Sequence, residues 1–243
     1  MKKEHLVLIF LIAFYNLIFV SLSLGRHLSL NSTYLDLGLE SQAVWNTSQG
    51  RWFEVSFGAN GSLVSALSYH VTPIIVLLAP FYRLWPSPVI LLFLQTFILS
   101  LGALAVYLLA KKILKSVRLA LIFVLVYLLY PPLQYANLFD FHYVTLAATL
   151  LLFAWYFMEI KRWNIFYLLL VLAVLTKENV ALVAALFGLY VFLIFKERKK
   201  GAIILLLFIL NEEWHDFWIS IFPIFIINKI SKRYKNIFIN SIK

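Results

Sequence analysis

The sequence lacks cysteine altogether and is poor in charged residues, which make up 13% of its 243 positions. The absence of cysteine excludes disulfide bonds as a source of stability. It also has no glycine-rich phosphate-binding loop, no internal repeat and no zinc-type ligand cluster. Hydrophobic residues account for 63% of the chain, and the mean hydropathy is +0.90. This composition excludes an ordinary soluble globular domain and is typical of polytopic membrane proteins.

Long apolar runs recur along almost the whole chain. A hydrocarbon core about 30 Å thick needs about 20 apolar residues per helix. The runs are continuous and rich in leucine and alanine, which favours helices. We predict an all-α polytopic integral membrane bundle over residues 1–210 and a divergent tail over residues 211–243, with a last span and a basic end. The expected spans cover residues 6–25, 87–110, 119–131, 141–159, 163–176, 179–195, 201–210 and 217–228.

Residues 163–195 allow two interpretations, because neither Gly nor Pro interrupts them near Lys177. One continuous helix would be about 50 Å long. It would also bury Lys177 and Glu178 near its middle, where ionisable side chains are costly. A turn at these two residues avoids that cost, so two helices are the preferred prediction.

The formal net charge of +10 comes mostly from short basic clusters between the apolar runs. Such clusters are typical of cytoplasmic loops, so they predict a cytoplasmic N-terminus and explain the charge without a nucleic-acid partner. The first run has a poor cleavage pattern, which favours an uncleaved signal anchor. The clusters lie within residues 2–3, 111–118, 161–162, 196–200 and 229–243, and the other basic residues are Arg26, Arg51, Arg83 and Lys177.

This threading makes residues 26–86 a long extracytoplasmic loop. Its stretch YLDLGLESQAVWN (34–46) alternates apolar and polar residues at helical spacing, which predicts an amphipathic helix on the membrane surface. Asp36 and Glu40, four residues apart, would share one face of that helix. The apolar stretch over 73–86 is too short to span, so it predicts a second interfacial or re-entrant helix.

The same threading places most acidic and histidine side chains on the outer side. Asp140 and His142 follow the helix-ending pair Pro131-Pro132 and a polar stretch. Ionisable groups at the hydrocarbon boundary are costly unless they are paired, hydrated or metal-bound, so their convergence predicts an aqueous cavity. The outer set comprises Asp36, Glu40, Glu54, His70, Asp140, His142, Lys177, Glu178, Glu212, Glu213, His215 and Asp216.

Four segments occur in an order that resembles a known family: DLGLESQAVWN (36–46), SYHVTPIIVLLAPFYRLWPSP (68–88), YPPLQYANLFDFHYVTLA (130–147) and LTKENVALVAALFGLY (175–190). The order is similar to that of the prokaryotic membrane proteins grouped as domain of unknown function 2079. The resemblance covers about residues 30–200, and FDFH with KEN is its most specific part. Those proteins are similar in layout to the C-type glycosyltransferases, which use a polyprenyl-phosphate sugar as donor.

The resemblance implies a C-type glycosyltransferase-like fold in a prokaryotic plasma membrane and sugar transfer from that lipid donor to an extracytoplasmic acceptor. Asp36 matches the outer-loop carboxylate that lies beside the acceptor, so it is the catalytic candidate. Asp140 and His142 are also candidate ligands for a divalent cation, for which oxygen and nitrogen donors suit Mg or Mn. The sequence after Leu210 departs from the family pattern, which indicates a truncated or divergent C-terminus. The candidates for binding the donor phosphate or substrate are His70, Asp140, His142, Lys177 and Glu178.

Structural alternatives exist for each of these residues. Asp36 could stabilise a helix dipole, and Asp140 and His142 could pair with each other or with Arg83. Lys177 and Glu178 could form an ordinary turn between two helices, with snorkelling side chains, and His70 could cap its helix beside Pro73. A transporter subunit is a second functional class, for which paired repeats and charges near the bilayer midplane are expected. A non-catalytic membrane scaffold is a third, and it would tolerate loss of the outer carboxylates.

Overall fold

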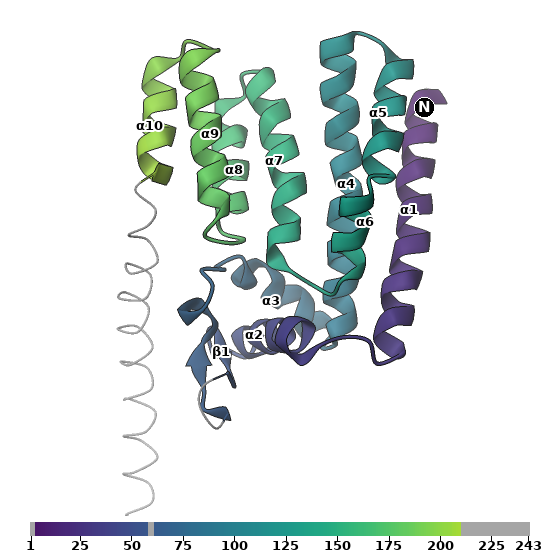
Figure 1. The fold of residues 1–243 in the computed structure, drawn as a ribbon, viewed down its shortest axis with the longest axis vertical. Coiled ribbons are helices and arrows are strands. Elements are labelled where there is room, and N and C mark those ends of the chain that lie inside the picture. The colour runs from purple at the N-terminus through teal and green to yellow at the C-terminus, as the bar shows by residue number, and fades with distance from the viewer. Residues whose placement is uncertain (1–2, 58–60, 210–243) are drawn as a thin grey trace, which may run out of the picture.

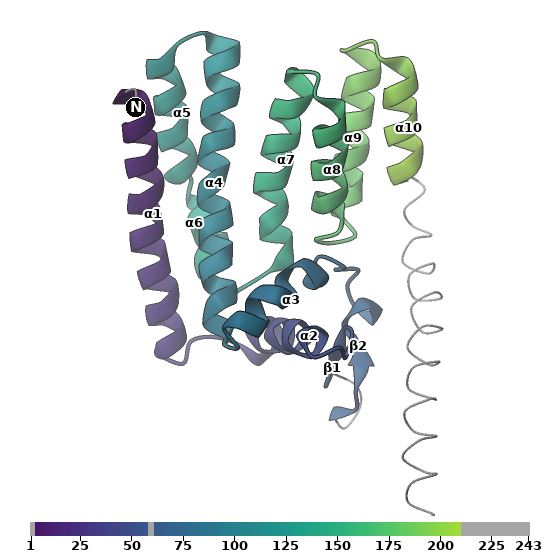
Figure 2. The same ribbon diagram turned by 180° about the vertical axis from the view of Figure 1, so that it is seen from behind.

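The computed structural model describes residues 3–57 and 61–209. They form a bundle of upright helices with a layer of short elements across one end (Figures 1 and 2). Two helices, α1 and α4, are long and apolar enough to cross a membrane, and the bent pair α5 and α6 would count as a third span. The bundle consists of α1 (Lys3–Leu28), α4 (Pro88–Leu114), α5 (Val117–Leu128), α6 (Pro131–Leu138), α7 (Tyr143–Glu159), α8 (Trp163–Val174), α9 (Val180–Leu193) and α10 (Arg198–Ile209).

Both ends of α4, and its connection to α5, illustrate how local sequence fixes the helix ends. The Ser87 hydroxyl accepts a hydrogen bond from the Val89 amide, and Pro88 occupies the first helical turn of α4. Lys115 ends that helix in the left-handed region, with φ of +52°. The next residue, Ser116, caps α5 by accepting from the Leu119 amide, so the reversal needs only two residues.

The layer across the end of the bundle, here called the loop layer, comes from the long segment between α1 and α4. Its helices α2 and α3 run across the bundle axis, and a two-stranded antiparallel hairpin lies beside them (Figure 2). The loop layer consists of η1 (Tyr34–Gly38), α2 (Leu39–Ser48), β1 (Glu54–Val55), β2 (Val64–Ser65), η3 (Ala66–Ser68) and α3 (Ile75–Leu84).

One hydrophobic cluster joins the loop layer to the bundle. Val44 of α2, Ile75 of α3, Leu91 of α4 and Phe141 before α7 are all fully buried in it. Burying such side chains stabilises the contact by about 1.5–3 kcal/mol each. The loop layer is therefore fixed against the helix ends, which is a requirement for any site formed between them.

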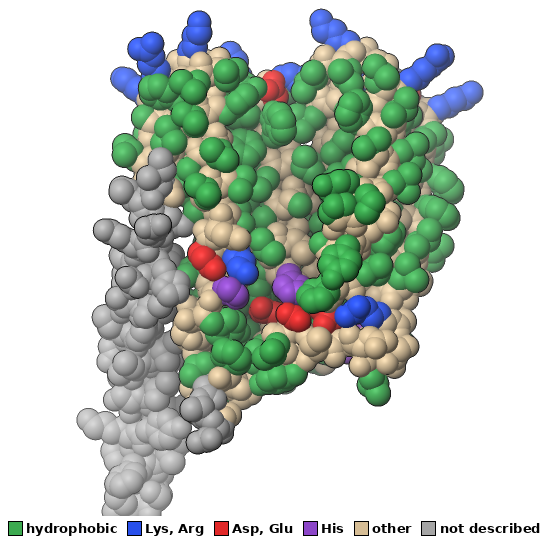
Figure 3. All heavy atoms as spheres, viewed as in Figure 1, with side chains coloured by type: hydrophobic (Ala, Val, Ile, Leu, Met, Phe, Trp, Pro, Cys, Tyr) green, Lys and Arg blue, Asp and Glu red, His purple; other side chains and the backbone are tan. Residues whose placement is uncertain are grey.

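The two ends of the bundle carry different charges. In Figure 3, Lys and Arg side chains crowd the end opposite the loop layer, while acidic and histidine side chains gather in a band where the helices meet that layer. The first end, here called the basic end, holds the turns at 115–116, 161–162 and 194–197. The separation of charge that the sequence predicts is present in the fold.

The main prediction, an all-α helical membrane protein, is confirmed. The chain also turns between α8 and α9 rather than forming one helix over 163–195. Helices appear at both predicted positions of the loop, as η1 with α2 and as α3. The predicted span over 217–228 and four outer-set residues lie outside the described residues, namely Glu212, Glu213, His215 and Asp216.

The structure corrects the predicted secondary structure in two places. Pro131-Pro132 ends one helix as predicted, but the polar stretch that follows forms α6, because proline is favoured in the first helical turn. The hairpin β1–β2 was not predicted, since each strand has only two residues and leaves no alternating pattern to detect. Predicted helix ends also shift by a few residues, as is usual for helix termini.

Candidate functional site

A cavity of about 500 Å³ lies where the loop layer meets the ends of α7 and α9. Five separate segments supply its walls: η1 with the start of α2, the segment after β1, the stretch before α3, the start of α7, and the turn between α8 and α9. Its lining mixes ionisable and apolar side chains. The lining residues are Leu35, Asp36, Leu39, Glu40, Phe57, Tyr69, His70, Thr72, His142, Tyr143, Val144, Thr176 and Lys177.

Asp36 and His142 form a hydrogen-bonded pair on one wall of the cavity. The His142 Nε2 lies 3.2 Å from Asp36 Oδ1. Thr33 fixes the carboxylate from the other side, because its hydroxyl donates to Asp36 Oδ2 at 2.6 Å and accepts from the Asp36 amide at 3.1 Å. The Phe139 ring stacks on the imidazole with centroids 5.5 Å apart. Both polar side chains are therefore held in one orientation.

His70 and Glu178 form a second pair beside the opposite wall. The His70 Nδ1 lies 3.0 Å from Glu178 Oε1, and the Val71 amide donates to Oε2 at 2.9 Å. Burial alone would raise the pKa of Glu178, but these hydrogen bonds and its own amide lower that pKa to about 2. A main-chain bond from the Ile74 amide to the Leu175 carbonyl, 3.0 Å long, ties the same two segments together.

The lowered pKa of Glu178 predicts an acid-sensitive stability. A carboxyl whose pKa falls from 4.5 in the unfolded chain to about 2 in the fold stabilises the protein fully above pH 4.5. That contribution is lost as the pH falls from 4.5 to 2. We expect Glu178→Gln to reduce the drop in unfolding midpoint over this window, measured by thermal unfolding in detergent. Glu54→Gln, in the loop layer but outside the cavity, should retain the wild-type drop.

Glu40 is the second carboxylate that lines the cavity, and it lies four residues after Asp36 on the same helical face. Burial raises its pKa to about 7, although a hydrogen bond with Tyr143 and the charges of His70 and Lys177 act in the opposite direction. The prediction that Asp36 and Glu40 share a face is confirmed, but the special environment of Glu40 was not predicted. Burial in the folded chain is its main cause, and burial is not readable from the local sequence.

Asp140 lies behind the cavity wall rather than in it. Its side chain is only 2% exposed, it accepts from the Thr33 amide at 2.9 Å, and its Oδ1 is 3.8 Å from Arg26 Nε. Asp140 thus pairs with Arg26 rather than with Arg83 or His142, the partners considered from sequence. Its φ of +117° is rarely adopted by L residues. The residue links the end of α1, the start of the loop layer and the turn before α7.

Gln95 of α4 fixes the turn before α7 from inside the helix bundle. Its side chain is fully buried. The Nε2 donates to the carbonyl of Asp140 at 2.7 Å and to that of Asn137 at 3.2 Å, while the Oε1 accepts from the His142 amide at 2.9 Å and the Thr145 hydroxyl at 3.0 Å. The role of Gln95 was not predicted, because a single polar residue in an apolar run does not indicate which groups it will bond. A glutamine in a predicted span is nevertheless a residue worth testing.

The predicted site residues thus separate into two groups. The cavity is lined by Asp36, His70, His142 and Lys177, with Glu178 bonded directly behind His70. Asp140 is not brought to the cavity. Within residues 3–57 and 61–209, no group of three or more His, Asp or Glu side chains is arranged to hold a metal ion. Asp140 is buried against Arg26 rather than beside His142, and the divalent cation expected from these two residues stays a prediction.

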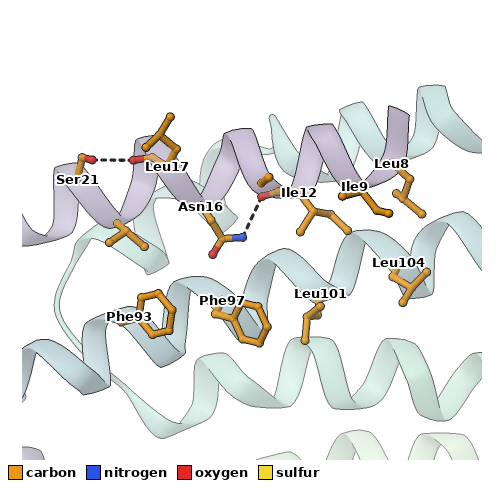
Figure 4. Close-up of a pocket in the computed structure, with 12 residues that line it drawn as sticks. Leu8, Ile9, Ile12, Asn16, Leu17, Ser21, Phe93, Phe97, Leu101 and Leu104 are labelled. Carbon is orange, nitrogen blue, oxygen red and sulfur yellow. Dashed lines mark hydrogen bonds between the residues drawn. The ribbon is translucent and has the colours of Figure 1, made fainter. Parts of the chain in front are cut away.

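A second pocket, of about 660 Å³, lies between α1 and α4 (Figure 4). Its walls are almost wholly apolar, with Phe93 and Phe97 facing Ile12 and Leu17. Asn16 is the notable polar residue, and its Nδ2 donates to the Ile12 carbonyl at 2.8 Å. The pocket has no titratable lining residue, so the cavity under the loop layer remains the candidate site.

The comparisons agree with the fold. The model of a family described as predicted membrane protein, DUF2079, matches residues 26–237. The match continues past Leu210, the point after which the sequence was predicted to depart from the family pattern. No curated protein and no solved structure matches the chain. Because the family match covers most of its length, the chain belongs to the DUF2079 family of predicted membrane proteins.

Proposed function

We propose that the protein is a multi-pass membrane glycosyltransferase that moves a sugar from a polyprenyl-phosphate donor to an extracytoplasmic acceptor. The observation that carries this proposal is the cavity itself. It brings two carboxylates, Asp36 and Glu40, into one space with His70, His142 and Lys177. Carboxylates suit proton removal from an acceptor hydroxyl, and basic side chains suit a departing phosphate.

The orientation follows from the charges at the two ends. Basic loops are retained in the cytoplasm, so the basic end is assigned to the cytoplasm and the loop layer to the outer side of a prokaryotic plasma membrane. The N-terminus of α1 lies at the basic end (Figure 1). This arrangement gives the cavity access to an extracytoplasmic acceptor and to lipids in the outer leaflet.

The proposed reaction is described with the side chains that line the cavity. The acceptor oxygen attacks the anomeric carbon, the bond from that carbon to the phosphate oxygen breaks, and its electron pair stays with the polyprenyl phosphate. Lys177 and His70 stabilise the negative charge that builds on this phosphate. A cavity carboxylate takes the acceptor proton. A divalent cation, which stays a prediction, would add positive charge at the same phosphate.

The donor lipid can reach the cavity from the bilayer. The lining includes the apolar side chains of Leu35, Leu39, Phe57 and Val144 beside the ionisable ones. Of these, Leu35 and Phe57 are 63% and 47% exposed, so they are available for contact with a polyprenyl chain. An amphipathic lining of this kind fits a ligand with a charged head and an apolar tail.

Sugar transfer by purified protein in proteoliposomes tests the proposal. We expect wild-type protein to transfer sugar from a polyprenyl-phosphate donor to an acceptor alcohol. Asp36→Asn removes the carboxylate that bonds to His142. We expect this loss to raise the activation free energy by about 1.5 kcal/mol, which corresponds to about a tenfold lower rate. Glu54→Gln is the matched control, since Glu54 pairs with Arg51 away from the cavity. A complete absence of transfer by wild-type protein would favour the scaffold or transporter alternatives.

A further inference from the structure

The two cavity carboxylates differ in what holds them. Both oxygens of Asp36 are engaged, Oδ1 by His142 and Oδ2 by the Thr33 hydroxyl. A carboxylate held in this way has little freedom to approach a substrate. Its geometry suits a residue that orients the imidazole of His142, as the acid does in an Asp–His pair.

Glu40 is placed differently. It lies in the first turn of α2 and its side chain lines the cavity. The Tyr143 hydroxyl donates to the main-chain carbonyl of Glu40 at 3.0 Å, which fixes this turn against the start of α7. The charged and titratable groups that face the carboxyl come from four other segments: Asp36, Tyr69, His70, Tyr143 and Lys177.

The geometry points to Glu40 as the group that receives the acceptor proton, with Asp36 as a positioning residue for His142. The inference rests on the proposed function. As the acceptor oxygen bonds to the anomeric carbon, its proton passes to a carboxylate oxygen of Glu40, while the electron pair of the broken bond leaves with the phosphate. Glu40 then returns the proton to water or to the released phosphate, so atoms and charge balance.

The environment of Glu40 suits this role. Its burial where the loop layer meets the bundle is the main cause that raises its pKa to about 7, and the negative charge of Asp36 adds to the effect. A general base is most effective when its pKa lies near the working pH, because a substantial fraction is then ionised and the ionised form still binds a proton well. Glu178 has the opposite environment, with a pKa lowered to about 2, and is a poor proton acceptor.

The pH dependence of sugar transfer separates the two carboxylates. In the wild type, kcat should rise with pH in a single step centred near 7. This rise is the acid limb of the pH profile, here called the limb. We expect Glu40→Gln to lower kcat by about 10²–10⁴-fold with little change in KM and to abolish the limb. Glu40→Asp should keep the limb at a reduced rate, which shows that a variant at this position can fold. Asp36→Asn should keep the limb as well.

Two results would overturn the assignment. One is a Glu40→Gln variant with wild-type kcat and an intact limb. The other is loss of the limb in Asp36→Asn rather than in Glu40→Gln. Infrared difference spectra give a readout that does not depend on turnover: a protonated-carboxyl band should disappear between pH 5 and 9 in wild type and be missing in Glu40→Gln. If wild-type protein shows this band but transfers no sugar, the proposed function fails while the titration of Glu40 stands. If no band titrates, the role of Glu40 fails even in an active enzyme.

Discussion

Replacing Gln95 with leucine should destabilise the protein by about 3 kcal/mol, because several buried polar groups lose their partner at once. The carbonyls of Asn137 and Asp140, the amide of His142 and the hydroxyl of Thr145 all bond to this one amide side chain. Each buried group left unpaired costs about 1–3 kcal/mol. Leucine has a similar size, so lost hydrogen bonds rather than a cavity dominate the effect.

The measurement is the free energy of unfolding in mixed micelles, with Gln134→Leu as the matched control. Gln134 lies on α6 in the same part of the fold and donates one hydrogen bond, to the Leu128 carbonyl at 3.0 Å. Its loss should cost about 1 kcal/mol. Equal effects of the two substitutions would contradict the central role of Gln95. The Gln95→Leu variant should also lose sugar transfer, because the turn that positions His142 is no longer fixed.

Replacing Lys177 with glutamine should lower kcat/KM for the lipid donor by about a hundredfold. Lys177 is half-buried, lines the cavity and comes from the turn between α8 and α9. It supplies a positive charge next to the position proposed for the donor phosphate. A hydrogen bond to a charged group contributes about 3 kcal/mol at most, which is about a factor of a hundred.

Lys177→Arg and Lys199→Gln complete this test. Arginine keeps the charge, so Lys177→Arg should recover much of the activity. Lys199→Gln removes a positive charge at the basic end and should leave transfer unchanged. The assay is donor-dependent transfer in proteoliposomes at several donor concentrations. A Lys177→Gln variant with wild-type kcat/KM would remove this residue from phosphate binding.

The helices of this fold could be predicted from sequence because hydropathy acts locally. An apolar run long enough to span, such as α4, specifies its own conformation, and the polar pair Lys177–Glu178 correctly indicated a turn. The start of α6 was harder, because a proline pair both ends one helix and opens another. The hairpin in the loop layer depends on tertiary contacts and left no local pattern.

The candidate site was predictable only in its chemistry. Residue type and the predicted topology indicated a shared cavity for Asp36 and His142, but not the direct contact between them, because 106 positions separate them in sequence. The partners of Asp140 could not be predicted, because they depend on where α1 ends and how the loop layer packs. The same is true of Glu40, whose unusual pKa arises from burial that only the fold creates.

The central claim is that the cavity residues share one aqueous space on the side of the membrane opposite the basic loops. Because the chain has no cysteine, single-cysteine variants can test it with a membrane-impermeant maleimide on intact cells. Leu35→Cys in the loop layer and Asn179→Cys in the α8–α9 turn should both label from outside, whereas Lys115→Cys at the basic end should label only after permeabilisation. Labelling of Leu35→Cys and Asn179→Cys from opposite sides would contradict the account.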